Sequence, residues 1–362
     1  MRVGIWAGTA AEYIKLFPVI NALKSRNTEV FLISSGQNLL FNNPLLNLSK
    51  SQVDLLLSRP TTKQTAFGLL IWFVKTSIVA LFKVPAFVRS KKIDCIVIHG
   101  DTVSTMMGAI VSRFAGVKVA HVEAGLRSFS LLRPFPEEIC RIVASRFVDI
   151  SFCPNNWAAK NLQKGIGGKK VVTHQNTLLD SLQTAKKLPP ISSVMKQIVH
   201  PYFIFVLHRQ ENLFDTSFVE KMFDRILKES LKLFCVMIIH KPTEMILRKL
   251  GIFNKIIDSP NVLVFERLDY VTFSHILMGC NFIVTDGGSN QEECFFLGKS
   301  CLVLRSESER TEGLGENIKL AGKNFDLIED FFSNPKQYER PSIHGFESPS
   351  EVIAKSLLGD DL

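Results

Sequence analysis

Acidic residues in the first half of the chain stand where they could exchange protons with a bound molecule. Asp101 closes the apolar run Cys95–Ile98, Glu123 follows the run Val117–His121, and Glu137 opens a helix-like stretch. Carboxylates grouped at one site have pKa values that burial and mutual repulsion push apart, which suits general acid and general base catalysis. A simpler interpretation, in which Asp101 only caps the next helix, stays open.

Basic side chains accompany these acids and recur in the second half of the chain. The candidates are Arg127, Arg133, Arg141, His208, Arg209 and Arg310. His208 and Arg209 follow the apolar run Tyr202–Leu207, and Arg310 lies in a charged loop. Guanidinium groups bind phosphate oxygens in pairs, so these residues predict an anionic ligand. For His208 a purely structural role is the alternative.

Two turns rich in small residues follow apolar runs and precede helix-like stretches. Gly8 and Thr9 form the first turn, and Gly287-Gly288-Ser289 forms the second. Free backbone N–H groups at the start of a helix, together with its positive end, can hold a diphosphate. Glu293, one helical turn further, could accept ribose hydroxyl groups. The first turn fits a plain strand-to-helix connection equally well.

Short apolar runs alternate with helix-like stretches along the whole chain, from Val3–Ala7 to Cys301–Leu304. This alternation predicts the α/β class, with two doubly wound, Rossmann-like domains. We expect a first domain over 1–182, a linker over 183–200, a second domain over 201–345, and a C-terminal helix within 346–362 that could pack back on the first domain. Ligands bind at the carboxyl ends of such strands, so the active site is expected in the cleft between the domains.

Composition narrows the classes of ligand and compartment. A chain of 362 residues with 46% hydrophobic and 21% charged residues fits two globular domains, and its net charge of +9 suits an anionic partner. The seven cysteines lack CxxC spacing and indicate buried thiols in a reducing, cytoplasmic compartment. No metal-binding pattern is present, so neither a metal nor another cofactor is expected. The basic residues do not form a polar stripe with stacking aromatics, which argues against nucleic acid as a partner.

The segment 67–92 does not fit a plain soluble enzyme. It is strongly apolar, and the stretch between Asp54 and Asp94 contains no acid but seven bases: Arg59, Lys63, Lys75, Lys83, Arg89, Lys91 and Lys92. A transmembrane helix is disfavoured because Lys75 and Lys83 interrupt the run and Pro85 should end it early. Two alternatives remain: a buried or homodimer-forming helix, and a patch that binds an anionic membrane surface peripherally, on its inner face.

Taken in order, the polar motifs resemble the UDP-N-acetylglucosamine 2-epimerase family, whose fold is of the two-domain GT-B type. The matching motifs are His99-Gly100-Asp101-Thr102, His121-Val122-Glu123-Ala124-Gly125-Leu126-Arg127, Pro136-Glu137-Glu138 with Arg141, Asn176-Thr177 with Asp180, His208-Arg209 with Glu211, Thr285-Asp286 with Gln291-Glu292-Glu293, and Glu309-Arg310 with Glu312. Each motif is short, but the set covers nearly the whole chain.

The resemblance implies a reaction and roles for the candidate residues. Enzymes of this family eliminate UDP from the sugar, pass through a 2-acetamidoglucal, and add UDP back with C2 inverted. Asp101, Glu123 and Glu137 would form the acid–base set, and His208 would stabilise the leaving diphosphate. The nucleotide pocket would include Arg141, Gly288, Ser289 and Glu293. The implied role is the supply of an amino sugar for surface polysaccharide biosynthesis.

Departures from the family pattern leave the reaction open. The first loop is usually GTRPE, but Ala10 and Ala11 replace the arginine and proline, so a cation near the diphosphate is missing. The glycine turn is also shifted, since Gly287 and Gly288 precede Ser289. The chain has Gly36-Gln37-Asn38 where non-hydrolysing members have GQH. We therefore keep two alternatives: a hydrolysing epimerase that releases UDP and N-acetylmannosamine, and a membrane-associated GT-B glycosyltransferase with a lipid-linked acceptor.

Overall fold

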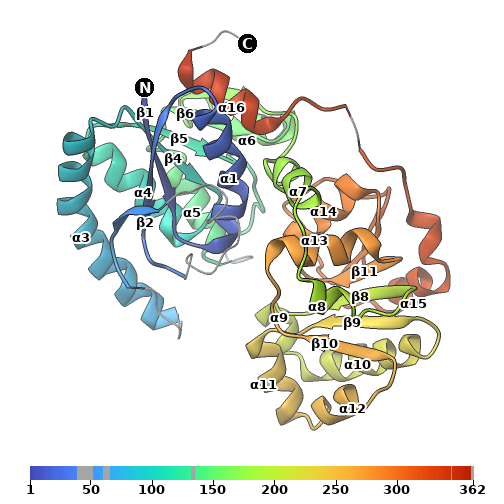
Figure 1. The fold of residues 1–362 in the computed structure, drawn as a ribbon. Coiled ribbons are helices and arrows are strands. Elements are labelled where there is room, and N and C mark those ends of the chain that lie inside the picture. Colours follow the sequence, from blue (N-terminus) through green and yellow to red (C-terminus); the bar gives the residue numbers. More distant parts are fainter. Residues whose placement is uncertain (39–51, 60–65, 132–134, 344, 360–362) are drawn as a thin grey trace. The chain divides into compact units, whose positions relative to one another are not determined.

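The computed structural model describes residues 1–38, 52–59, 66–131, 135–343 and 345–359 (Figure 1). Of the residues considered above, Lys63 and Arg133 lie outside this part. The chain divides into two compact units. Unit 1 comprises Met1–Ser181 and Phe346–Leu362, and unit 2 comprises Leu182–Gly345. The stretch expected to be a linker, 183–200, belongs to unit 2 and contains the end of α7 (Leu178–Lys186) and all of α8 (Ser192–Met195).

Within the described residues, unit 1 is built on a seven-stranded parallel sheet with the order β3-β2-β1-β4-β5-β6-β7. Its strands are β1 (Arg2–Ala7), β2 (Glu29–Ser34), β3 (Val53–Leu56), β4 (Cys95–His99), β5 (Lys118–Val122), β6 (Ile150–Cys153) and β7 (Lys169–Val172). The central strands are apolar and buried along their length, as expected for strands that are covered on both faces. The direction of strand succession reverses between β1 and β4, and a ligand site is expected at such a point.

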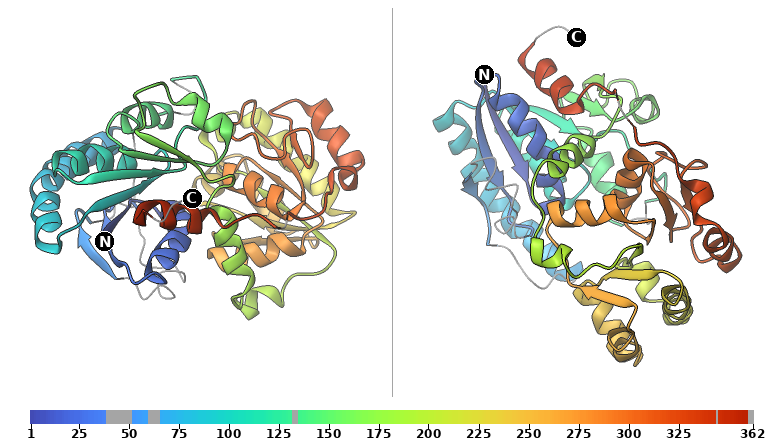
Figure 2. Two further views of the ribbon diagram at one scale, coloured as in Figure 1. Left: turned by 90° about the horizontal axis from the view of Figure 1, so that it is seen from above. Right: turned by 45° about the vertical axis from the view of Figure 1, so that its right-hand side comes forward.

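Helices cover both faces of this sheet (Figure 2). They are α1 (Ala10–Lys24), α3 (Ala66–Lys91), α4 (Val103–Phe114), α5 (Glu137–Ala144), α6 (Asn156–Asn161) and α16 (Pro349–Leu358). α3, α4 and α5 pack side by side, whereas α16 packs on α1. Two polar contacts hold α16 in unit 1: Arg26 Nη2 lies 2.5 Å from Glu351 Oε2, and the Ser350 N–H donates to Asp180 at 2.9 Å.

Unit 2 repeats the arrangement with a six-stranded parallel sheet in the described residues, in the order β10-β9-β8-β11-β12-β13. Its strands are β8 (Tyr202–Val206), β9 (Phe234–Ile238), β10 (Val262–Phe265), β11 (Phe282–Thr285), β12 (Ser300–Val303) and β13 (Ile318–Leu320). Its remaining helices are α9 (Gln210–Leu213), α10 (Thr216–Ser230), α11 (Lys241–Lys249), α12 (Phe253–Ile257), α13 (Tyr270–Gly279), α14 (Gly288–Leu297) and α15 (Phe325–Ser333). The reversal of strand succession here falls between β8 and β11.

Helix α3 differs from the expectation for the segment 67–92. It continues through Pro85 to Lys91, whereas Pro85 was expected to end it. Proline removes one helical hydrogen bond, but Val84 and Val88 on either side are buried in the core of unit 1, and this packing stabilises the last turns. The described residues contain one helical segment, Gly68–Lys91, that is long and apolar enough to cross a membrane, and 22% of its apolar window is buried.

The seven cysteines are all buried and free of disulfides, as the sequence indicated. Burial raises the pKa of the Cys95 and Cys153 thiols to about 12, so these thiols stay protonated and act as small apolar side chains.

Candidate active site

The candidate acids of unit 1 follow neighbouring strands at the carboxyl edge of its sheet. His99 at the end of β4 lies beside Val122 at the end of β5, and the Gly100 N–H donates to the Val122 carbonyl at 3.0 Å. Asp101 follows β4 after Gly100, and Glu123 follows β5 directly, next to the point where strand succession reverses. Parallel strands therefore bring two carboxylates to the position where this fold class binds ligands.

Glu123 is the most constrained of these acids. Its φ of 63° lies in the left-handed region, which is costly for a residue with a side chain and is common at functional sites. Its buried carboxylate lies 2.5 Å from Lys15 Nζ and 3.1 Å from His99 Nε2. Lys15 is also buried and projects from α1, which is otherwise largely apolar. The cluster Lys15–Glu123–His99 thus holds this carboxylate in place at the sheet edge.

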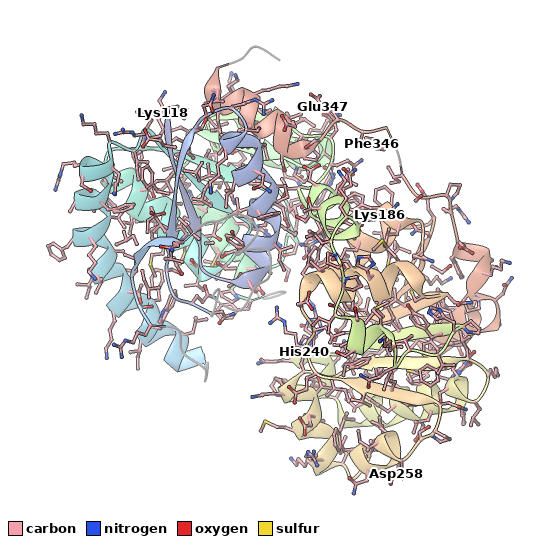
Figure 3. All side chains as sticks on the ribbon, in the orientation of Figure 1. Lys118, Lys186, His240, Asp258, Phe346 and Glu347 are labelled. Carbon is pink, nitrogen blue, oxygen red and sulfur yellow. The ribbon has the colours of Figure 1, made fainter. Side chains whose placement is uncertain are left out.

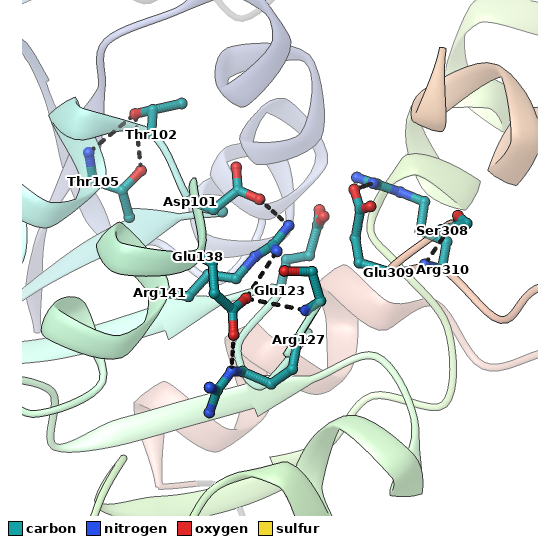
Figure 4. Close-up of polar contacts among 12 residues, drawn as sticks. Asp101, Thr102, Thr105, Glu123, Arg127, Glu138, Arg141, Ser308, Glu309 and Arg310 are labelled. Carbon is teal, nitrogen blue, oxygen red and sulfur yellow. Dashed lines mark hydrogen bonds and ion pairs between the residues drawn. The ribbon is translucent and has the colours of Figure 1, made fainter. Parts of the chain in front are cut away.

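Asp101 belongs to a second network, in which arginines connect acids (Figure 4). Arg141 donates from Nη2 to Asp101 and from Nη1 to Glu138 at 3.3 Å. Arg127 Nε donates to the other Glu138 oxygen at 2.5 Å. Burial by itself would raise the pKa of Glu138, but the Ser128 N–H and the two arginines outweigh it, and the pKa falls below its usual value. Arg127 and Arg141 therefore already bind protein carboxylates.

Glu137 is the first residue of α5 and is partly exposed. The charges of both Asp101 and Glu137 act on the buried Cys140 thiol, whose pKa burial raises to about 12. Both acids are therefore close enough to the Cys140 thiol for their charges to affect its pKa. The positive end of α5 favours a negative charge at Glu137.

The first small-residue turn is occupied by a protein carboxylate. Glu12 Oε2 accepts the N–H groups of Gly8 and Thr9 at 2.6 and 2.9 Å, and Glu12 Oε1 accepts the Thr102 hydroxyl at 2.5 Å. A Cβ at Gly8 would lie 2.2 Å from Ser104 Oγ, so the strand end is tightly packed against α4. Gly8 and Thr9 thus shape the sheet edge, and in this structure their N–H groups are taken by Glu12.

In unit 2, His208 and Asp286 follow the two strands that flank the reversal point. Asp286 Oδ1 lies 2.9 Å from His208 Nδ1, and its carboxylate also accepts the Arg209 N–H at 2.9 Å and the Asn212 amide at 3.0 Å. Burial alone would raise the pKa of Asp286, but His208 and these donors lower it below its usual value. A carboxylate on Nδ1 leaves Nε2 of His208 as the nitrogen that can face a ligand.

His240 stands next to His208, with the ring centroids 4.9 Å apart (Figure 3 labels His240). Burial, followed by the charges of His208 and Arg267, lowers the pKa of His240 to about 4. His240 is therefore neutral at physiological pH and adds no charge beside His208. Arg209 extends the same network by donating from Nε to the Asp286 carbonyl at 2.9 Å.

The glycine turn after β11 leads into α14, and no side chain caps that helix. The first-turn N–H groups at Gly288 and Ser289 therefore remain available to an anion. A Cβ at Gly288 would lie 2.7 Å from Arg310 Nη1, so the absence of a side chain makes room for this guanidinium. Arg310 lies 3.1 Å from Glu292 and also pairs with Glu309.

Glu293, the expected ribose ligand, is buried on α14 and accepts the Asn290 amide at 3.1 Å. Its charge acts on the buried phenol of Tyr270, whose pKa lies well above its usual value because of burial first and Glu293 second. Within the described residues, no group of three or more metal-ligating side chains could hold an ion.

The structure thus gathers the predicted residues into two sets, one at the carboxyl edge of each sheet. Unit 1 holds Gly8, Thr9, Asp101, Glu123, Arg127, Glu137 and Arg141, and unit 2 holds His208, Arg209, Gly287, Gly288, Ser289, Glu293 and Arg310. Residues without a predicted role join them, and the most important are Lys15, Glu138 and Asp286. The signal for Lys15 was a lone cation in a run of apolar helix positions. For Asp286 it was the strand-end rule that had already selected Asp101.

Comparisons with known proteins identify the family of this chain. A family model described as UDP-N-acetylglucosamine 2-epimerase matches residues 21–340. The UDP-N-acetylglucosamine 2-epimerase of Methanococcus maripaludis is 28% identical over an alignment of 378 positions, which covers 99% of this chain and 99% of that protein.

Solved structures show the same similarity. UDP-GlcNAc 2-epimerase from Neisseria meningitidis, bound to UDP-GlcNAc, gives a TM-score of 0.83 at 26% identity and covers 99% of this chain and 100% of its own. The Methanocaldococcus jannaschii enzyme in complex with UDP-GlcNAc and UDP gives 0.82 at 26% identity, with coverage of 99% and 100%.

The relatives have the GT-B-type fold, and the two parallel sheets with their helices confirm the predicted α/β class. The resemblance drawn from the motifs is confirmed as well, because the family model spans most of the chain. This chain belongs to the UDP-N-acetylglucosamine 2-epimerase family.

Proposed function

We propose that this protein epimerises UDP-N-acetylglucosamine, or a related UDP-amino sugar, at C2. The observation that carries this proposal is the pair of acids at adjacent strand ends, Glu123 held by Lys15 and His99, and Asp101 held by Arg141. Removal of a weakly acidic C2 proton requires a base fixed at one atom, and inversion requires an acid that returns a proton from the opposite face. Two carboxylates with separate supports meet that requirement.

The reaction has two steps, an elimination of UDP followed by its re-addition with the C2 proton on the opposite face. In the first step a carboxylate takes the C2 proton while the bond between C1 and the diphosphate oxygen breaks, which yields a 2-acetamidoglucal and UDP. In the second step a carboxylic acid protonates C2 on the other face, and the diphosphate oxygen attacks C1. Asp101, Glu123 and Glu137 are the proposed acid–base set. The variants described in the Discussion would show which of them removes the proton and which returns it.

In this proposal, unit 2 would supply the groups that bind the departing UDP. The N–H groups at Gly288 and Ser289 would bind the diphosphate, and Arg310 beside Gly288 would add a fixed positive charge. Glu293 would accept ribose hydroxyl groups, and Arg209 would orient the turn that carries His208. His208, held at Nδ1 by Asp286, would present Nε2 to the diphosphate as charge develops there.

The first loop, in which Ala10 and Ala11 replace the arginine and proline usual in the family, would shape the site without binding the diphosphate itself. Gly8 and Thr9 are bonded to Glu12, and Ala10 and Ala11 offer no cation, so diphosphate binding depends on unit 2. Arg127 is proposed to orient Glu138, and Arg141 to orient Asp101, instead of binding phosphate directly.

The test is proton NMR of the purified full chain with UDP-N-acetylglucosamine in deuterated water, with no lipid present. We expect UDP-N-acetylmannosamine with deuterium at C2. Release of UDP and free N-acetylmannosamine would instead identify the hydrolysing reaction. If the spectrum stays unchanged and product forms only when a lipid-linked acceptor is added, the epimerase proposal is wrong and the glycosyltransferase alternative is supported.

The proposed setting is the cytoplasm, with the enzyme bound peripherally to the inner face of an anionic membrane through the segment 67–92. The favouring observation is the local excess of bases on an apolar segment that contains no acid. A homodimer that uses the same segment is the alternative.

A further inference from the structure

A cavity of about 150 Å³ lies in unit 1 beside the arginine network. It is formed by the end of β5 and the loop that follows, by α5 and the turn after it, and by the end of α6 and the residues that follow. The proposed acids Asp101, Glu123 and Glu137 do not line it. A cavity of this volume can hold benzene, so it accepts a molecule of about six to ten non-hydrogen atoms.

Three guanidinium groups and no carboxylate line this cavity in the described part of the chain. Two of them, on Arg127 and Arg141, already bind Glu138 and Asp101, so those four charges offset one another (Figure 4). The third, on Arg146, is exposed and pairs with no carboxylate among the described residues. The cavity therefore carries one positive charge that the protein does not neutralise, and this charge favours an anion.

A hydrogen-bond acceptor also lines the cavity. His121 is buried, and its Nε2–H donates to the Gly100 carbonyl at 2.7 Å. Burial lowers the pKa of His121 to about 4, so the ring is neutral at physiological pH and its Nδ1 carries a lone pair. Nδ1 has no hydrogen-bond partner among the described residues, which is uncommon for a buried polar atom. A hydroxyl group that donates to Nδ1 would complete its hydrogen bonding.

The burial of the lining residues gives the cavity a direction. Arg146 and Gln163 are exposed and mark its open side, whereas His121, Leu126 and Leu162 are buried and form its inner wall. A ligand whose anionic end meets Arg146 would place its carbon atoms against the two leucines and a hydroxyl group near His121.

This combination favours a phosphate group as the anion. The terminal oxygens of a phosphate accept hydrogen bonds from several N–H groups at once, and guanidinium groups match them in pairs. A nucleoside diphosphate is too large for the cavity, so the ligand differs from the UDP that unit 2 is proposed to bind.

We infer that this cavity is a second binding site, which takes a small phosphorylated molecule that also carries a hydroxyl group. The phosphate binds Arg146 at the open side, and the hydroxyl donates to Nδ1 of His121. The occupant would also lie against Arg127 and Arg141, which hold Glu138 and Asp101. The inference does not rest on the epimerase chemistry, because binding is measured without a sugar substrate.

The test is calorimetry of the full chain with three probes: glycerol 3-phosphate, ethyl phosphate, which lacks the hydroxyl groups, and inorganic phosphate. Saturating UDP is present throughout, so that the nucleotide turn of unit 2 does not contribute. We expect glycerol 3-phosphate to bind with a Kd below about 1 mM. Ethyl phosphate should bind about three- to tenfold more weakly, the loss of one hydrogen bond.

Variants locate the binding. Arg146→Gln should raise the Kd for glycerol 3-phosphate about tenfold or more, and Arg146→Lys, which keeps the charge, should raise it less. The matched control is Arg89→Gln, because Arg89 is also exposed and pairs with no carboxylate among the described residues. The control should bind like the wild type, and all three variants should keep the wild-type circular dichroism spectrum.

Three outcomes would decide against parts or all of the inference. If none of the probes binds, or if Arg146→Gln binds as tightly as Arg89→Gln, the cavity is not an anion site. If ethyl phosphate matches glycerol 3-phosphate, the contact with His121 is wrong. Tightest binding of inorganic phosphate would support the anion site and identify the free ion as its ligand. Failure of UDP to bind would count against the proposed function, and the comparison of the two glutamine variants would still report on the cavity.

Discussion

The Nδ1 atom of His208 lies 2.9 Å from the Oδ1 atom of Asp286, and this contact joins the residues that follow β8 and β11. The two strands flank the reversal point of the unit 2 sheet, and Asp286 is buried, so the contact fixes the imidazole at the carboxyl edge of that sheet. It also selects the tautomer with the proton on Nδ1 when His208 is neutral.

Asp286→Asn tests this arrangement. An asparagine amide cannot provide the carboxylate charge, and its N–H group would favour the wrong tautomer of His208. We expect turnover to fall by about 100-fold while UDP affinity stays close to that of the wild type. Steady-state kinetics and calorimetry with UDP measure the two quantities, with the exposed Asp258→Asn as control. Equal losses in turnover and UDP affinity would mean that Asp286 only holds the nucleotide turn.

The three acids should affect chemistry more than binding. Asp101→Asn, Glu123→Gln and Glu137→Gln are each expected to lower turnover by about 100-fold or more, because each removes a proton carrier and keeps the side-chain volume. Deuterium incorporation at C2 without net epimerisation would reveal the variant that lacks only the acid step. Full activity in all three variants would refute the assigned chemistry.

Lys15→Met leaves the Glu123 carboxylate buried without its nearest cation. Removing one partner of a buried ion pair costs about 3 to 5 kcal/mol, so the free energy of unfolding should drop by that amount and turnover should fall as well. Urea denaturation followed by circular dichroism measures the stability. The exposed Lys164→Met is the control and should change neither quantity. A Lys15→Met protein of wild-type stability would show that Glu123 does not need this cation.

Acid sensitivity should trace in part to His121. Burial lowers its pKa to about 4, while its Nε2–H donates to the Gly100 carbonyl at 2.7 Å. The unfolded chain, with an ordinary histidine pKa near 6.5, binds the proton more strongly, so stability is lost as pH falls from 6.5 towards 4. Between pH 7 and pH 5 this single group should lower the free energy of unfolding by about 2 kcal/mol. The loss should shrink in His121→Gln, and an equal loss in that variant would assign the effect to other groups.

Gly288→Ala tests the nucleotide turn. The new methyl group would lie 2.7 Å from Arg310 Nη1, and Glu292 and Glu309 hold that guanidinium in place. We expect the Kd for UDP to rise about tenfold, the loss of one good charge-assisted contact. The melting temperature should stay near that of the wild type, since the crowding falls on a side chain. An unchanged Kd would argue against a role for this turn in nucleotide binding.

Prediction from sequence worked best where burial and periodicity act together. The predicted apolar runs Cys95–Ile98 and Tyr202–Leu207 match β4 and β8 to within one residue, because parallel strands covered on both faces must be largely apolar. Four of the described strands, β3, β6, β7 and β13, were missed. β7 begins with two lysines at the edge of its sheet, and β13 has only three residues, so neither has a clear apolar run.

The site was predicted in its outline but not in its connections. The rule that ligands bind at strand ends selects Asp101, Glu123 and His208, but it cannot say which cation neutralises which acid. Lys15 lies far from Glu123 in sequence, and only the packing of α1 on the sheet brings the two together. The sequence also does not show that the Arg141 guanidinium, which was expected to contact the nucleotide, is bonded to Asp101 and Glu138. Helix α3 was misjudged at Pro85 because core packing outweighed the local penalty for proline.

Helix α16 completes unit 1 although it is the last helix of the chain. During synthesis, all of Leu182–Gly345 must leave the ribosome before Ser350 can reach Asp180 and Glu351 can reach Arg26. The order of translation therefore delays the completion of unit 1 until α16 has been made, although residues 1–181 leave the ribosome first.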